Sequence, residues 1–480
     1  MTKLKILFKF QICNLIMSII FKIKKLIPKK LFKTLQPPYH FFMSWFSAFV
    51  YRHPSEDIIV IGVTGTTGKT TSVYLIAKML EEAGLKTGFT STAAFNDGKK
   101  EWLNDKKMTM VGRFFTQKML RHMVKNGCRY TVIETTSEGI VQYRHRFINF
   151  DILVFTGLYP EHIDSHGSFE KYKEAKGRLF AHLKNCKIKR MDDSGRIIKS
   201  ESGIRKIELQ QIEKVIIANG DDEQAEYFLG FSAVKKIAYT KNNDLQLAIK
   251  NLKKIIFGDI KASGKGTSFV VDGAVINLGL LGEFNAVNAM NAVSVGQAIG
   301  LDMTIIKSGL EKIKGIDGRL EKIEEGQPFA VIVDYAFEPN AVEKLYGALK
   351  YIPHGKIIHV LGSTGGGRDV ARRPVLGKLA GMNADYVIVA NEDPYDDDPE
   401  IIIDQVALGA EHAGKKIGEN LFKILDRREA IKKALELATE NDIVLITGKG
   451  SEQAICIANG EKIPWDDRAV VRGLLNELKR

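Results

Sequence analysis

The chain has 480 residues, of which 45 % are hydrophobic and 26 % are charged. A chain of this length forms about two to four domains, and its composition excludes a disordered, collagen-like or coiled-coil protein. The four cysteines lie far apart without a CxxC pair, which excludes a zinc ribbon and disfavours a disulfide scaffold. We therefore expect a protein of the reducing cytoplasm.

Positive charge is concentrated at the N-terminus. Residues 1–55 contain nine lysines, one arginine and no acidic residue, so they carry +10 of the net charge of +13. The remaining residues are nearly neutral, which argues against a nucleic-acid-binding protein because such a protein spreads basic residues over its binding surface.

Apolar runs at 10–21 and 41–50 lie between these charges. The first run has twelve residues without charge, which is shorter than the about 20 that a membrane-spanning helix needs. Lysines interleaved with Phe and Trp are typical of a helix at the membrane interface, although such helices can also pack on the protein itself. We expect residues 1–54 to form a basic, apolar helical segment that contacts the inner face of the membrane.

Two series of apolar, β-branched runs predict buried parallel strands. The first series comprises 57–63, 130–134, 152–156 and 215–219, with a helix over 69–83. The second comprises 330–336, 356–362, 385–391 and 442–448, with helices over 338–350 and 427–439. This alternation predicts an α/β fold with a central domain over 55–317, built on a mostly parallel sheet, and a Rossmann-like C-terminal domain over 318–480. The polar stretch 187–212 is expected to leave the fold as a surface excursion.

The strand over 57–63 leads into a glycine-rich turn and a helix, an arrangement that binds phosphate through backbone N–H groups and the helix dipole. Gly65 and Gly68 would let the backbone approach the phosphates, Lys69 would place a charge at the β- and γ-phosphates, and Thr70 would offer a hydroxyl to Mg²⁺. Val63 stands where the strict pattern has its first glycine. The context still favours a P-loop that binds ATP over a plain surface turn.

Residues 62–71, GVTGTTGKTT, resemble the ATP loop of the Mur ligases, the ATP-dependent amide-forming enzymes of peptidoglycan synthesis. The resemblance implies ATP contacts from Gly65, Thr66, Thr67, Gly68, Lys69, Thr70 and Thr71.

A metal site is implied by two further segments. Glu134 ends the strand over 130–134, where a carboxylate faces the ligand crevice of a parallel sheet. Residues 156–180 resemble the family stretch in which a His binds a second Mg²⁺ and a downstream Lys becomes carbamylated, with His162 and Lys176 at the matching positions. The resemblance implies two Mg²⁺ held by Thr70, Glu134, His162 and carbamylated Lys176. Without that motif, Lys176 would be taken for an exposed helix lysine.

Two segments, one before and one at the predicted domain boundary, complete the nucleotide site in this resemblance. GEFNAVNAMNA at 282–292 matches the family segment whose second Asn approaches adenine, here Asn288, and an amide can hydrogen-bond a purine edge. DGRLE at 317–321 matches an interdomain motif in which Arg319 would reach a phosphate.

Two segments of the C-terminal domain face the same nucleotide in the resemblance. VDYAFEPNA at 333–341 matches a nucleotide-contacting motif that includes Asp334, although Phe337 replaces the family's His. GSTGGGRDVARRP at 362–374 matches a motif in which Arg368 would approach the transferring phosphoryl group as an electrostatic clamp.

The amino-acid end resembles the MurE branch, which adds the third amino acid to a UDP-linked muramyl dipeptide. Diaminopimelate-specific members use the Arg of D-N-P-R to bind the distal carboxylate, and Tyr395 replaces that Arg here. Because acids follow at 396–398, we hypothesise an amino acid with a cationic side chain, such as lysine or ornithine; a solvated acidic loop is the alternative. The resemblance implies substrate contacts from Thr135, Thr136, Ser137, Asp393, Tyr395, Gly448 and Glu452.

Members of the MurE branch begin with a uridine-binding domain, which residues 1–54 do not resemble, because βαβ units need about 30 or more residues each. We therefore expect that domain to be missing or replaced. The acceptor is then either a UDP-linked muramyl peptide held without the usual uridine site or a lipid-linked one at the membrane.

The sequence thus predicts an ATP-dependent carboxylate–amine ligase that acts on a muramyl peptide and an amino acid through an acyl phosphate. Alternatives are a folylpolyglutamate- or cyanophycin-type ligase, or a MurT-like subunit, although the four-cysteine ribbon of that group is absent. A non-catalytic, ATP-binding membrane scaffold is a further alternative. Glu134, His162 and Lys176 argue against it, because a scaffold needs no two-metal site.

Overall fold

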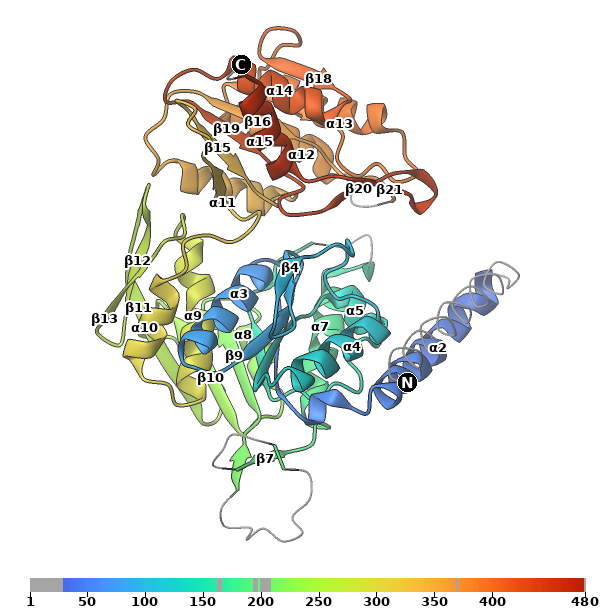
Figure 1. The fold of residues 1–480 in the computed structure, drawn as a ribbon, viewed down its shortest axis with the longest axis vertical. Coiled ribbons are helices and arrows are strands. Elements are labelled where there is room, and N and C mark those ends of the chain that lie inside the picture. The colour runs from blue at the N-terminus through green and yellow to red at the C-terminus, as the bar shows by residue number, and fades with distance from the viewer. Residues whose placement is uncertain (1–28, 162–165, 193–196, 199–208, 368–369, 479–480) are drawn as a thin grey trace.

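The computed structural model describes residues 29–161, 166–192, 197–198, 209–367 and 370–478. Two α/β units follow each other along the chain and lie one above the other in Figure 1. We call residues 54–311 the central unit and residues 321–478 the C-terminal unit. Helix α2 (Lys29–Val50) precedes both and lies beside the central unit.

The central unit is built on an eleven-stranded sheet of order β13-β12-β11-β10-β9-β6-β1-β5-β2-β3-β4. All neighbours from β11 to β2 in this order are parallel, whereas β12 and β13 at one edge and β3 and β4 at the other are antiparallel. The strands are β1 (Ile59–Thr64), β2 (Thr87–Thr90), β3 (Ala94–Asn96), β4 (Glu101–Leu103), β5 (Tyr130–Glu134), β6 (Ile152–Phe155), β9 (Val215–Asn219), β10 (Lys235–Thr240), β11 (Leu252–Ser263), β12 (Gly266–Val271) and β13 (Ala274–Leu278).

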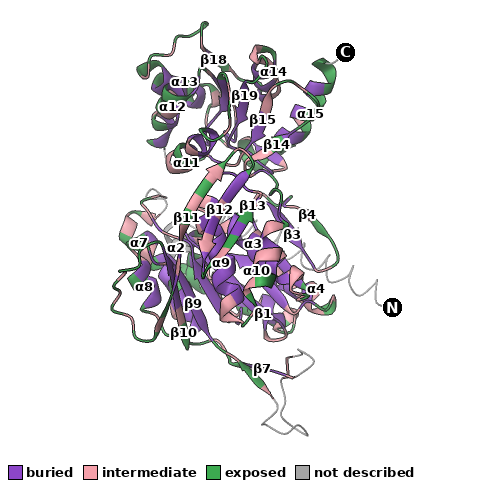
Figure 2. Cartoon of the chain, turned by 90° about the vertical axis from the view of Figure 1, so that its left-hand side faces the viewer, coloured by how far each residue is buried: buried purple, intermediate pink, exposed green. Residues whose placement is uncertain are grey.

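Helices cover both faces of this sheet, which is why its inner strands are apolar on both sides. Ile59 and Ile61 of β1 face α3 (Lys69–Glu82), α9 (Phe284–Ala298) and α10 (Met303–Glu311). Val60 faces the opposite layer of α4 (Arg113–Lys125), α5 (Ser137–Val141), α7 (Phe169–Leu183) and α8 (Ala225–Leu229). Figure 2 shows the strands buried between these helices and the exposed residues on the outer surfaces.

The C-terminal unit has a six-stranded sheet of order β14-β15-β19-β16-β17-β18, in which only β14 is antiparallel to its neighbour. Its strands are β14 (Glu321–Ile323), β15 (Ala330–Val333), β16 (Ile357–Leu361), β17 (Tyr386–Ala390), β18 (Leu421–Ile424) and β19 (Ile443–Ile446). Helices α11 (Pro339–Leu349), α12 (Arg372–Asn383) and α13 (Pro399–His412) cover one face, and α14 (Arg427–Leu437) and α15 (Asp467–Leu478) cover the other.

Short elements complete the described chain. They are η1 (Pro54–Glu56), η3 (Ala458–Gly460) and the two-stranded pairs β7 (Lys189–Met191) with β8 (Gln210–Ile212) and β20 (Ala454–Cys456) with β21 (Lys462–Pro464). The predicted excursion at 187–212 contains β7 and β8, which lie at the bottom of Figure 1.

The predicted α/β fold is confirmed. The apolar runs of the first series are β1, β5, β6 and β9, and those of the second are β15, β16, β17 and β19. The sequence analysis missed the edge strands β2–β4 and β10–β13. The sheets change between α10 and β14, and the domain limits 55–317 and 318–480 stay a prediction.

Helix α2 packs on the central unit through one face only. Ser44 donates from Oγ to the carbonyl of Tyr143 at 2.9 Å, and Phe46 lies edge-on to Phe114. The other face exposes a row of stacked aromatic rings, in which Trp45 is 41 % and Phe49 is 59 % exposed. Within the described residues, no helix is long and apolar enough to cross a membrane; the run at 10–21 lies outside them.

Candidate active site

A cavity of about 840 Å³ opens where the central and C-terminal units meet. The parallel strands β1, β5 and β6 end at this cavity, and their loops help to line it. Most predicted site residues that the structure describes line it: Thr66, Thr67, Gly68, Lys69, Thr70, Thr71, Glu134, Thr136, Ser137, Asn288, Arg319, Asp334, Asp393, Tyr395, Gly448 and Glu452. Gly65, Thr135 and Lys176 do not line it. His162 and Arg368 lie outside the described residues.

The loop between β1 and α3 needs glycine at two positions. A Cβ at Gly65 would lie 2.0 Å from Thr156 Oγ1, and a Cβ at Gly68, where φ is +77°, would lie 2.3 Å from Asn288 Oδ1. Thr156 Oγ1 also donates to the carbonyl of Thr67 at 2.6 Å, which ties the loop to the end of β6. The backbone of this loop can therefore approach a ligand closely, as a phosphate site requires.

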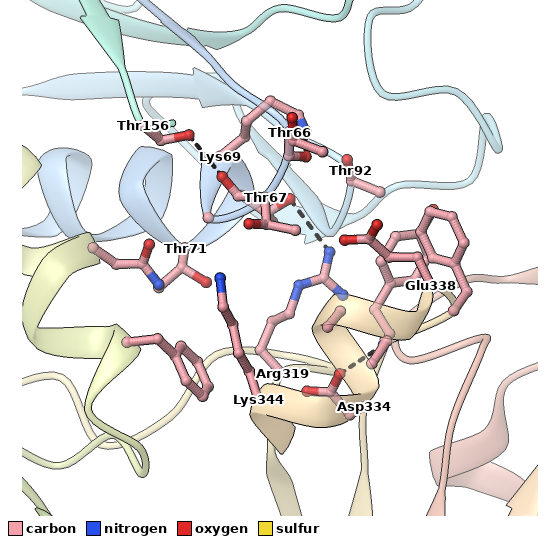
Figure 3. Close-up of a pocket in the computed structure, with 18 of the residues that line it drawn as sticks. Thr66, Thr67, Lys69, Thr71, Thr92, Thr156, Arg319, Asp334, Glu338 and Lys344 are labelled. Atoms are coloured by element: carbon pink, nitrogen blue, oxygen red, sulfur yellow. Dashed lines mark hydrogen bonds between the residues drawn. The ribbon is translucent and has the colours of Figure 1, made fainter. Parts of the chain in front are cut away.

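Lys69 begins α3, and its ammonium folds back onto the loop. Its Nζ donates to the carbonyl of Thr66 at 2.6 Å, and Figure 3 shows the two residues side by side. Burial lowers the pKa of Lys69, although the carboxylates of Glu134 and Glu338 act in the opposite direction. A phosphate would give this ammonium a stronger partner than a backbone carbonyl.

A carboxylate and hydroxyls meet beside the loop, because β5 lies between β1 and β2 and these three parallel strands end at the same edge of the sheet. Glu134 Oε2 accepts from Thr70 Oγ1 at 3.0 Å. It also accepts from the backbone N–H of Thr92 at 2.8 Å, while Glu134 Oε1 accepts from the Thr92 hydroxyl at 3.0 Å. Carboxylate and hydroxyl oxygens are the ligands that Mg²⁺ prefers, so Thr70 and Glu134 fit such an ion.

Lys176 lies beneath the loop on α7. Its side chain is buried, and its Nζ donates to the carbonyl of Gly65 at 2.8 Å. Burial, together with the nearby charge of Lys69, lowers the pKa of Lys176 well below its usual range. This environment favours the neutral amine.

Asn288 approaches the loop from the other side, on α9. Its Nδ2 donates to Asn285 Oδ1 at 3.0 Å, so the orientation of its amide is fixed. The side chain is buried beside Gly68. A contact of Asn288 with adenine stays a prediction.

Arg319 crosses from the link between the units to the loop. Its Nη2 donates to Thr70 Oγ1 at 3.3 Å, and its guanidinium lies 4.3 Å from the centre of the Tyr335 ring. Asp334 accepts from the backbone N–H of Leu320 at 2.7 Å, which holds the turn that presents Arg319. Burial raises the pKa of Asp334, although Arg319 opposes this shift. Figure 3 shows Arg319 pointing toward the threonines of the loop.

The opposite end of the cavity holds a buried acid pair. Asp393 and Glu452 both accept from Lys449 Nζ at 2.9 Å, and the Lys449 side chain is fully buried. Burial raises the pKa of Asp393, but Lys449, Lys107 and the backbone N–H of Cys456 together outweigh burial and lower this pKa overall. Tyr395 and Gly448 line the adjacent wall. We call Asp393 and Glu452 the acid pair.

The three residues after β5 differ in their positions. The Thr135 hydroxyl is buried and donates to the carbonyl of Val63 at 3.0 Å, so it serves the sheet instead of facing the cavity. Thr136 caps α5, and Ser137 Oγ lies 3.0 Å from His166 Nε2. The substrate roles of all three stay predictions.

The cavity residues that the sequence analysis missed include Thr92, Lys107, Arg144, Glu338 and Lys344. Thr92 follows β2, and a threonine just after a parallel strand is a usable signal once that strand is recognised. Glu338 and Lys344 lie on the predicted helix over 338–350, and Figure 3 shows Lys344 pointing toward the loop. Lys107 and Arg144 have no local signal, because only the tertiary fold brings them to the cavity.

The cavity therefore joins an anion-binding loop to an acid-lined pocket. Within the described ranges, no three His, Cys, Asp or Glu side chains gather as a preformed metal site.

Both units that form this cavity match models of a known protein family. Residues 63–211 match the Mur ligase middle domain, and residues 318–450 match the Mur ligase glutamate ligase domain. A UDP-N-acetylmuramyl-tripeptide synthetase of Roseiflexus sp. is 37 % identical over 90 % of this chain and 81 % of the relative. A UDP-N-acetylmuramoyl-L-alanyl-D-glutamate–2,6-diaminopimelate ligase of Halalkalibacterium halodurans is 32 % identical over 89 % of this chain and 80 % of the relative.

Solved structures agree with this assignment. The structure of a UDP-N-acetylmuramoyl-L-alanyl-D-glutamate–2,6-diaminopimelate ligase has a TM-score of 0.56 at 25 % identity, covering 93 % of this chain and 83 % of that one. A Mycobacterium tuberculosis folylpolyglutamate synthase shares the fold, with a TM-score of 0.61 at 15 % identity over 91 % of this chain and 95 % of that one. Mur ligases form C–N bonds with hydrolysis of ATP and use Mg²⁺. The chain belongs to the Mur ligase family.

Proposed function

We propose that this ligase joins an amino acid to the free carboxylate of a muramyl peptide of the UDP-N-acetylmuramoyl-L-alanyl-D-glutamate type. One observation carries the proposal: the phosphate loop and the acid pair line the same cavity, from different units. An enzyme that activates a carboxylate with ATP and then couples it to an amine needs both sites within one water-excluding space. The relatives named as tripeptide synthetases support this acceptor.

The residues divide the reaction between them. The acceptor carboxylate attacks the γ-phosphorus of ATP, which gives an acyl phosphate and ADP. Lys69 and Arg319 face the transferring group, and we assign Arg368 the same role, so that positive charge offsets the charge that develops there. The amine of the incoming amino acid then attacks the acyl carbon, loses a proton and expels phosphate.

Phosphate release tests this activity directly. The full chain is given Mg–ATP, UDP-N-acetylmuramoyl-L-alanyl-D-glutamate and single amino acids, and inorganic phosphate is measured. We expect release only when both acceptor and amino acid are present. Phosphate release that requires a lipid-linked muramyl peptide would show that the acceptor is carried by lipid instead of UDP. ATP binding without phosphate release under any condition would favour a non-catalytic scaffold.

The second metal ligand set depends on Lys176. We propose that its neutral amine adds CO₂ to form a carbamate and a proton, which gives an anionic ligand, and that His162 completes a second site beside Thr70 and Glu134. Bound Mg²⁺ would neutralise phosphate charge at both positions. The burial of Lys176 and its depressed pKa support this step.

Carbon-13 NMR with labelled bicarbonate detects such a carbamate. We expect one carbamate signal in the wild type and in Lys173→Met, which changes an outer lysine of the same helix that lies over the Tyr227 ring. The signal should be lost in Lys176→Met. Retention of the signal in Lys176→Met would contradict the assignment.

The acid pair and Tyr395 support an amino acid with a cationic side chain. No arginine occupies position 395, so a distal carboxylate lacks the bidentate partner that the family's diaminopimelate enzymes use. A kinetic comparison of lysine, ornithine and diaminopimelate tests this specificity. A clear preference for diaminopimelate would contradict it.

The exposed face of α2 favours contact with an anionic membrane surface. Phe42, Trp45 and Phe49 form its aromatic row, in which the Trp45 and Phe49 rings stack and the Phe42 ring is tilted against Trp45. Residues 1–55 carry ten positive charges and no negative one. Aromatic rings enter the headgroup region while lysines attract anionic lipids. This complementarity points to a lipid surface as the partner.

Sedimentation with vesicles tests this contact. We expect binding to phosphatidylglycerol vesicles but little binding to phosphatidylcholine vesicles. Trp45→Glu and Phe49→Glu should weaken it, whereas Val234→Glu, at a residue 61 % exposed on the central unit, should not. Equal binding to both kinds of vesicle, or none, would contradict the proposal.

A further inference from the structure

Lys107 of the central unit reaches across the cavity into the C-terminal unit. Its Nζ lies 2.6 Å from Asp393 Oδ2 and also contacts Glu452 Oε2. Its side chain is only 4 % exposed. The contact joins residues 286 positions apart in the chain. Lys106, the preceding residue, turns its ammonium to the exposed Asp105 instead.

The backbone at Lys107 is strained, and the surrounding loop holds it in place. Its φ is +54°, a left-handed conformation that is unfavourable for a residue other than glycine. Buried Asn104 fixes the loop, because its Nδ2 donates to the carbonyl of Met108 at 3.0 Å and its Oδ1 accepts from the N–H of Lys106 at 2.8 Å. Thr109 joins this loop to the phosphate side of the cavity through Thr92.

Lys107 supplies one of the two ammonium groups that contact the acid pair. Asp393 and Glu452 face two ammonium groups, those of Lys449 and Lys107, in an alternating ring. Burial would lower the pKa of Lys107, but Glu452 and Asp393 raise it overall, so its ammonium stays charged. If Lys107 withdrew, both carboxylates would share the single ammonium of Lys449 and one negative charge would be uncompensated, which is costly unless another cation replaces Lys107.

We propose that Lys107 occupies the subsite for the side-chain ammonium of the incoming amino acid and is displaced when that amino acid binds. This inference rests on the proposed function and extends it. A primary ammonium on an unbranched alkyl chain already fits between the two carboxylates, so the subsite takes an amino acid that ends in the same group. Lys107 thereby keeps the acid pair neutral between turnovers, and a side chain without an ammonium cannot take its place between the two carboxylates.

Equilibrium binding tests this role without requiring turnover. Calorimetry measures the affinity of the full chain for L-lysine and for L-norleucine, which has a similar chain without the ammonium. Lys107→Met should bind L-lysine about tenfold or more tightly than the wild type, since removal of one partner from a buried charge pair changes affinity by at least this factor. Norleucine should bind equally to both proteins.

Two matched variants complete the test. Lys106→Met removes the neighbouring, exposed ammonium and should bind lysine as the wild type does. Lys107→Arg keeps the positive charge and should not gain affinity for L-lysine. This variant also tests the proposal if Lys107→Met does not fold, because a gain in affinity for L-lysine would contradict it.

Weaker or unchanged lysine binding by Lys107→Met, an equal gain for norleucine, or no lysine binding by any of these proteins would overturn the proposal. A protein that shows the expected binding differences but never releases phosphate from ATP would contradict the proposed function alone.

Discussion

The two ends of the cavity are built by different means. At the phosphate end, glycines and strand-end residues lie close in sequence, and the backbone itself forms the binding surface around Gly65 and Gly68. At the amino-acid end, long charged side chains from both units meet, as Lys107 meets Asp393. The difference shows that binding at the phosphate end depends on the shape of the backbone. Binding at the amino-acid end depends on a balance of charges, which a single substitution can change.

This contrast fits the chemistry of each end. Every enzyme that uses ATP in this way must hold the same phosphates, so a rigid backbone site is suited to the task. The amino acid is the variable part of the reaction, and exchangeable side chains such as Tyr395 can alter it without disturbing a strand. Substitutions that disturb the phosphate end should therefore abolish activity, whereas substitutions at the amino-acid end should change the preferred amino acid.

The largest effect is expected from Gly68→Ala. The added Cβ would lie 2.3 Å from Asn288 Oδ1 at a φ of +77°, so the loop must shift to accept it. A displacement of about 1 Å at a reacting centre can cost about 10²-fold in rate. We expect a loss of this size or more in phosphate release, with a fall in melting temperature of about 2–4 °C for each kcal/mol that the left-handed backbone costs alanine.

Gly84→Ala is the matched control. Gly84 follows the other end of α3 with a φ of +73°, but a Cβ there would meet nothing within 4 Å. Both variants therefore carry the cost of alanine at a positive φ, but only Gly68→Ala brings a Cβ into collision with Asn288. Equal activity losses in the two variants would show that the close approach at Gly68 is unimportant.

A smaller effect, on specificity, is expected from Tyr395→Arg. Tyr395 lines the cavity beside the acid pair, and an arginine there would add a bidentate partner for a distal carboxylate while repelling an ammonium. We expect the ratio of kcat/KM for diaminopimelate over lysine to rise by about tenfold or more. Tyr395→Phe, which adds no charge, should leave this ratio unchanged.

The fold could be predicted from sequence where burial on both faces imposes a continuous apolar run, as in β1 and β19. The edge strands were missed because their residues alternate between buried and exposed positions, as in β11, or form very short pairs, as in β3 and β4. These strands pair with neighbours that are distant in sequence, so the local residue pattern alone does not predict them.

The site divides in the same way. Lys69, Thr70 and Glu134 follow strands that the sequence reveals, and strand order brings them together. Lys107 could not be found, because nothing near it predicts that its side chain crosses to another unit. The Thr135 hydroxyl donates to the carbonyl of Val63, a contact that no local pattern indicates, and its substrate contact stays a prediction.

The smallest expected effect concerns stability at the amino-acid end. Burial, and then the charge of Asp393, raises the pKa of Glu392 to about 7. Its Oε2 is buried without a hydrogen-bond partner. The unfolded chain ionises this group near pH 4.5, so its favourable contribution is complete below that pH and is lost as the pH rises through about 7.

Glu392→Gln removes the titration but keeps the shape. The variant should therefore melt at a higher temperature than the wild type at pH 8, by about 2–4 °C for each kcal/mol that the buried charge costs, and the difference should vanish toward pH 4.5. Glu419→Gln, at an exposed site, should show no such dependence. If Glu392→Gln gave no gain in melting temperature at pH 8, the cations around the acid pair would have to compensate the ionised Glu392. The amino-acid end of the cavity would then tolerate a change of charge at this residue without loss of stability.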